Sequence, residues 1–203
     1  MIHTLRILTA TSALFTGTLT PPVHQPRPAI VTIDMSSSER DMAARAVALF
    51  DEAGLELPSV IIRRFHDTVG CHGNDGQYRF DHGRSEVDIC TPDDTAWEER
   101  VIVHELAHAW SFRYLTPARK EMFRQLRGWK YWLNYTHAEW KDNGAEQAAE
   151  IIVWALSDHP VPVMRIDHHT CAELHAGYIA LTGLEPLHGY TGRCHESSPD
   201  GRS

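Results

Sequence analysis

Two histidines and a glutamate, in the segment His104-Glu105-Leu106-Ala107-His108, are the residues whose types and spacing most clearly suggest chemistry. Residues four apart on a helix lie on one face, so both imidazoles can bind one metal ion. Glu105 lies about 100° further round the helix, where it can act on a metal-bound water as a general base. Apolar side chains surround the motif from Val101 to Phe112, which predicts a buried helix. Buried imidazoles need partners, and a metal ion would supply them.

A catalytic zinc ion usually has a third protein ligand, and Glu146 and Glu150 lie four residues apart on a later apolar segment. One carboxylate can bind the metal, while the other accepts a hydrogen bond from a ligand histidine and fixes its orientation. Alternatively, Glu146 forms a capping box with Asn143, and Glu150 is then the ligand. The extended metzincin pattern HExxHxxGxxH does not apply, because Ser111 and Tyr114 stand at its glycine and last histidine positions.

In these two motifs, over residues 85–157, the chain resembles the gluzincin (thermolysin-like) zinc metallopeptidases. The resemblance implies one zinc ion per chain and zinc-dependent hydrolysis of peptide bonds in a peptide or protein substrate. It implies a general base at Glu105 and, at Glu150, a carboxylate that orients a ligand histidine; gluzincins have aspartate at that position. The zinc ligands that it implies are His104, His108 and Glu146.

The expected elements give an α+β fold. With the resemblance, this becomes a small zincin-like domain with a short, mostly antiparallel sheet, followed by the active-site helix and a helical C-terminal half. Two short apolar segments around Asp81-His82-Gly83 predict a hairpin, and helical periodicity with caps predicts the helices. The predicted strands are 59–65, 77–80 and 85–89, and the predicted helices are 38–53, a motif helix ending near 114, 116–126, 144–156 and 170–181.

Other residues are expected near such a site. In zincins, a strand just before the motif helix forms the sheet edge and binds substrate as an added strand, and Ser85–Ile89 occupies that place here. Candidates for an oxyanion-stabilising side chain are His168, His169, His175, Tyr178, Tyr131 and Tyr135. Further aromatic side chains either line a specificity pocket or, as we favour, belong to the core: Trp129, Tyr131, Trp132, Tyr135 and Trp140.

The composition excludes several classes of protein. The chain has 203 residues, 42% hydrophobic and 23% charged, which indicates a globular domain rather than a disordered chain. A net charge of -8 without a basic run argues against a nucleic-acid partner. No apolar stretch is long enough for stable membrane insertion. The 14 histidines suit metal chemistry.

The N-terminal segment and the cysteines predict a secreted or otherwise extracytoplasmic protein. Residues 1–28 have the pattern of a signal peptide followed by a proline-rich spacer, and the zincin-like domain is expected over 29–203. Four cysteines in an exported chain predict two disulfides. Three pairings are possible, and we favour Cys71–Cys90 with Cys171–Cys194, since each closes a short loop.

Two other functions fit the same sequence. One is a catalytically inactive zincin-like protein that holds zinc without peptidase activity. The other is a disulfide-stapled extracellular binding module in which the HExxH pattern is accidental. The binding module predicts no stoichiometric metal, and a chelator would then leave its stability unchanged.

Overall fold

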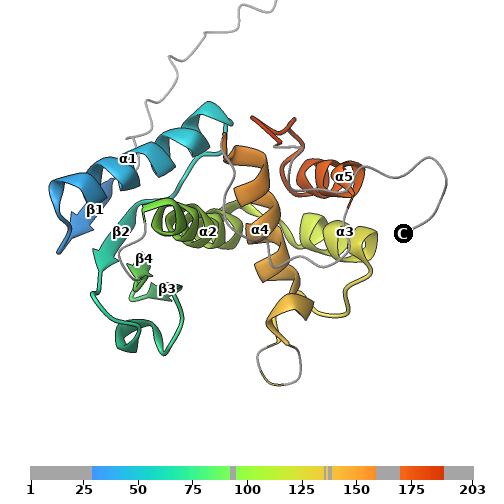
Figure 1. Cartoon of the computed structure of the whole chain (residues 1–203). Helices are drawn as coiled ribbons and strands as arrows, with labels where there is room; N and C mark the ends of the chain where they lie inside the picture. The colour runs from blue at the N-terminus through green and yellow to red at the C-terminus, as the bar shows by residue number, and fades with distance from the viewer. Residues whose placement is uncertain (1–28, 92–94, 135, 137–138, 159–169, 190–203) are drawn as a thin grey trace, which may run out of the picture.

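A small sheet lies at one side of the molecule and helices are layered beside it, with α2 and α4 crossing near the centre (Figure 1). The structure is a computed structural model, and it describes residues 29–91, 95–134, 136, 139–158 and 170–189. The predicted signal peptide and spacer, residues 1–28, lie outside the described residues. The described part is mixed α+β, with five α-helices and a four-stranded sheet.

The sheet has the order β1-β2-β4-β3 and is mixed. Its strands are β1 (Ile30–Ile33), β2 (Val60–Arg64), β3 (Gly76–Asp81) and β4 (Arg84–Ile89). Strand β2 is parallel to both β1 and β4, and only β3 is antiparallel to its neighbour. The prediction of a mostly antiparallel sheet is therefore wrong. Helix α1 (Ser37–Glu52) is the crossover that returns the chain for parallel pairing of β1 with β2.

The edge strand beside the motif helix is β3 rather than β4. The prediction that Ser85–Ile89 forms this edge is wrong, because β4 lies between β2 and β3. The turn between β3 and β4 is tight: His82 and Gly83 both adopt positive φ, at 47° and 78°, as a two-residue turn between twisted strands requires. The chain therefore reverses directly after β3, and β4 lies on the inner side because it also pairs with β2.

Four further helices bring the chemical residues together. They are α2 (Thr95–Tyr114), α3 (Pro117–Arg127), α4 (Gly144–Leu156) and α5 (Cys171–Thr182), and two short 3-10 turns lie at Val69–Cys71 and Trp140–Asp142. Helix α2 packs on β3 and β4 with one side and on α4 with another. Every residue of α4 is buried, so a carboxylate on this helix needs a polar or charged partner inside the protein.

A disulfide joins Cys71, just before β3, to Cys90, just after β4. This is one of the two predicted pairs, and it ties the turn that enters the edge strand to the sheet. Cys171 is the first residue of α5, while its predicted partner Cys194 lies outside the described residues. Within the described ranges, no helix is long and apolar enough to cross a membrane.

Candidate metal centre

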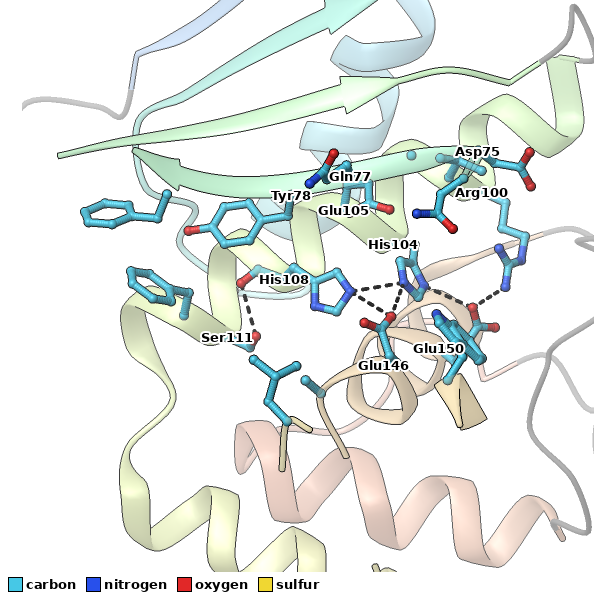
Figure 2. Close-up of a pocket in the computed structure, with 18 of the residues that line it drawn as sticks. Asp75, Gln77, Tyr78, Arg100, His104, Glu105, His108, Ser111, Glu146 and Glu150 are labelled. Carbon is cyan, nitrogen blue, oxygen red and sulfur yellow. Dashed lines mark hydrogen bonds and ion pairs between the residues drawn. The ribbon is translucent and has the colours of Figure 1, made fainter. Parts of the chain in front are cut away.

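The site lies where α2 faces α4, next to the edge strand β3 (Figure 2). His104 and His108 are four residues apart on α2 and point toward α4, as the motif spacing predicts. Glu146 lies in the first turn of α4 and points back at both rings. Two helices, each fixed by the core, therefore position these three side chains.

Three ligand-type atoms converge at this point. Glu146 Oε2 is 3.2 Å from His104 Nε2 and 3.1 Å from His108 Nε2, and the two imidazole nitrogens are 3.1 Å apart. Donors at about 2.0–2.1 Å from one ion, at tetrahedral angles, are about 3.3–3.4 Å apart. The observed separations are close to these values. The spacing of these three atoms therefore fits a single metal ion. In the part of the chain that the structure describes, His104, His108 and Glu146 form a group that could hold one.

Glu150 lies beside one of the two rings. Its Oε1 lies 3.0 Å from His104 Nδ1, so the ring lies between two carboxylates, with Nδ1 beside Glu150 and Nε2 beside Glu146. Arg100, one turn before His104 on α2, contacts the same oxygen. Glu150 itself lies outside the group of converging atoms, and the glutamate that joins the histidines is Glu146.

The capping box that would have occupied Glu146 does not form. Asn143 precedes α4 without a side-chain cap bond, and its Oδ1 accepts a hydrogen bond from the Asn134 N–H at 2.6 Å. The Glu146 carboxylate is thus directed to the histidines.

The charges of the site are strongly coupled. Burial alone would lower the pKa of His104, but the carboxylates of Glu146 and Glu150 outweigh burial and raise this pKa to about 10. Burial would raise the pKa of Glu146, yet the charges and hydrogen bonds of His108 and His104 hold it well below its usual range. The pKa of Glu150 is lowered against burial by His104 and Arg100. The buried carboxylates thus favour positive charge between them, as a cation site requires.

Glu105 is buried beside this cluster, on the side of β3. Burial raises its pKa, although His104 and His108 partly oppose the shift. A Cβ atom on Gly76 would lie 2.8 Å from Glu105 Oε1 and 2.5 Å from Val101 Cγ1. Only glycine at position 76 therefore lets the edge strand run this close to the glutamate.

A cleft of about 840 Å³ contains His104, Glu105, His108 and Glu146 in its lining. Trp132 and Trp140 also line it, and the Trp140 ring stacks on His104 at 6.0 Å between centroids. Trp129 packs against the core instead. The aromatic segment is thus divided between cleft and core.

None of the described oxyanion candidates lines this cleft. His175 is exposed and pairs with Glu185 at 2.7 Å, and Tyr178 is fully buried on α5. Tyr131 forms a bridge with Asn143 outside the cleft. His168, His169 and Tyr135 lie outside the described residues.

Sequence reasoning did not single out Tyr78 on β3 or Arg100 on α2, and both line the cleft. The Tyr78 ring stacks near His108, at 6.5 Å between centroids. Arg100 had a sequence signal, because it precedes His104 by the same four residues that separate the histidines. Tyr78 had none, since its place depends on which strand forms the edge.

Comparison of the chain with protein-family models, curated proteins and solved structures finds no match.

Proposed function

We propose that this protein is a zinc-dependent peptide hydrolase of gluzincin type, with one zinc ion held by His104, His108 and Glu146. The observation that carries the proposal is the convergence of these three side chains, with a further buried glutamate, Glu105, in the same cleft. Two imidazoles and one carboxylate are a donor set that catalytic zinc sites use. An accidental HExxH pattern would not require a facing carboxylate on a separate buried helix.

A zinc ion bound there would lower the pKa of a bound water and polarise a substrate carbonyl. Glu105 acts as the general base: it takes the proton of the attacking water and passes it to the leaving amine. Its burial, which raises its pKa, makes the carboxylate a stronger proton acceptor. Glu150 keeps the His104 ring in place during these steps.

The substrate is a peptide or protein segment that lies along β3 as an added strand. In the part of the chain that the structure describes, strand β3 pairs with β4 on one side only, and its other side borders the cleft. The Tyr78 backbone faces Glu105 and partly opposes the rise in the pKa of this carboxylate. Because main-chain groups of a strand alternate in direction, those of Gly76 and Phe80 point the same way. We therefore propose that β3 is the strand with which the substrate peptide pairs.

We also propose that the protein works outside the cytoplasm. The Cys71–Cys90 disulfide fits an oxidising compartment.

The test of the proposed function is hydrolysis of a library of unstructured peptides by the untagged full chain. We expect cleavage that a chelator abolishes and that stoichiometric zinc restores. A protein that binds zinc but cleaves nothing would be the inactive zinc protein. A protein that binds no zinc would be the binding module, and either result would refute the peptidase.

Gly76→Ala is expected to lower both stability and activity, because the added methyl group must displace Glu105 and Val101. Overpacking of this kind costs about 1–3 kcal/mol. Urea unfolding measures the first effect, and kcat on a cleaved peptide measures the second.

Gly83→Ala, on the same hairpin, is the matched control. Its φ of 78° makes alanine strained, but no atom lies within 4 Å of the added methyl group. We expect a stability loss without a change in kcat. Equal kcat in the two variants would show that the close approach of β3 to Glu105 does not matter for the reaction.

A further inference from the structure

The row of polar side chains on α2 extends one turn beyond the candidate ligands. Arg100, His104 and His108 follow one another at intervals of four residues, and Glu146 and Glu150 form the facing row on α4 (Figure 2). The two rows interleave, so that Glu146 lies between the histidines and Glu150 lies between His104 and Arg100. Basic and acidic side chains thus alternate among these five residues.

The Glu150 carboxylate has a second basic partner besides His104, namely the guanidinium of Arg100. The Glu150 side chain is fully buried, and Oε1 contacts both Arg100 Nη2 and, at 3.0 Å, His104 Nδ1. Among the described residues, Glu150 Oε2, Arg100 Nε and His104 Nδ1 have no hydrogen-bond partner, so the ion-pair contacts at Glu150 Oε1 join these three side chains. Removing one member of such a buried pair leaves an uncompensated buried charge.

The Arg100 guanidinium contacts Trp97 on the side that faces away from Glu150. The guanidinium lies 4.9 Å from the centre of the Trp97 ring, and Trp97 Nε1 donates a hydrogen bond to Asp75 Oδ2 at 3.1 Å. Asp75 directly precedes the edge strand. The guanidinium is therefore confined between an anchored indole and the Glu150 carboxylate, and its position is fixed from both sides.

We propose that Arg100 is a positioning residue of the metal centre, which holds the Glu150 carboxylate against His104 and thereby directs His104 Nε2 at the metal. This inference rests on the proposed function of the site. Glutamate has one more torsion to fix than the aspartate of the resembled family, and a guanidinium on its oxygen fixes that torsion. Arg100 would not contact the metal itself and would act only through Glu150.

The test is a double-mutant cycle on the Zn²⁺ affinity of the full chain, measured by competition with a chromophoric chelator. Arg100→Met should weaken Zn²⁺ binding by about 10–100-fold, the usual effect of losing a group that orients a ligand. In a Glu150→Gln background, the same substitution should change the affinity by less than about twofold, because the carboxylate on which Arg100 acts is absent. The Co²⁺ absorption spectrum reports any change in ligand geometry independently of activity.

Arg64→Met is the matched control. Arg64 is also a buried arginine, paired with Glu39 at 3.0 Å, but it does not line the cleft. Its replacement should destabilise the metal-free protein and leave Zn²⁺ affinity unchanged. If Arg100→Met does not fold, Arg100→Lys replaces it in the test. Lysine keeps the positive charge but lacks the planar guanidinium, so it should weaken Zn²⁺ binding less than methionine does, again through Glu150.

The outcomes separate the two proposals. Failure of the unmodified protein to bind Zn²⁺ would refute the proposed function. Normal Zn²⁺ binding by Arg100→Met, or the same loss of affinity in both backgrounds, would refute the role of Arg100 and leave the proposed function standing. A change confined to KM for peptides would also refute it, since Arg100 would then act on substrate.

Discussion

Glu105→Gln abolishes measurable peptide hydrolysis and leaves zinc bound: this is the expected result with the largest effect on activity. Glutamine has the same shape, so the packing of Glu105 below β3 is kept, but it cannot accept a proton. Loss of a general base typically lowers kcat by about 10²–10⁴-fold. The measurement is kcat on a cleaved peptide, with zinc content determined on the same sample.

Glu99→Gln, on the same helix, is the matched control. Glu99 pairs with Arg45 at the surface and does not line the cleft. It should change neither kcat nor zinc content. Full activity of Glu105→Gln would show that Glu105 is not the general base, even if the protein binds zinc.

The second large effect is on metal affinity, and it distinguishes the two glutamates of α4. Glu146→Gln should weaken zinc binding by well over about 100-fold, because a ligand atom is replaced by a neutral amide. Glu150→Gln removes only the group that orients His104 and should cost about 10–100-fold. The zinc-induced rise in melting temperature should follow the same order.

Both glutamates are buried, so the metal-free variants must be compared first by urea unfolding. If Glu150→Gln weakens zinc binding more than Glu146→Gln does, the third ligand is Glu150.

Much of the helical part of the fold could be predicted from the sequence. Helix α4 begins and ends at the predicted residues, because its apolar run starts at Gly144 and stops before Ser157. Thr116 caps α3 and Gly128 ends it in the left-handed conformation, which are local signals. Local chemistry therefore fixes where these helices lie along the chain.

The sheet could not be predicted in the same way. Strand β1 has four residues and no alternation that separates it from the preceding proline-rich segment, so its parallel pairing with β2 was missed. Strand order depends on contacts between segments far apart in the chain, which a local pattern does not encode. The wrong choice of edge strand, and with it the omission of Tyr78, follows from this.

The candidate ligands illustrate what spacing can and cannot provide. The four-residue intervals of α2 and α4 placed the right side chains on one face of each helix. Spacing could not show which of Glu146 and Glu150 would meet the histidines, since both lie on that face. The packing of α4 across α2 brings Glu146 to both rings and Glu150 to the outer side of His104.

If His104, His108 and Glu146 bind one zinc ion, the purified protein contains stoichiometric metal. The measurement is inductively coupled plasma mass spectrometry of the untagged protein, purified without added zinc, beside His108→Ala and the exposed control His175→Ala. We expect about one zinc ion per chain in the unmodified protein and in His175→Ala, and almost none in His108→Ala. No stoichiometric metal in the unmodified protein, and no uptake when zinc is offered, would contradict it.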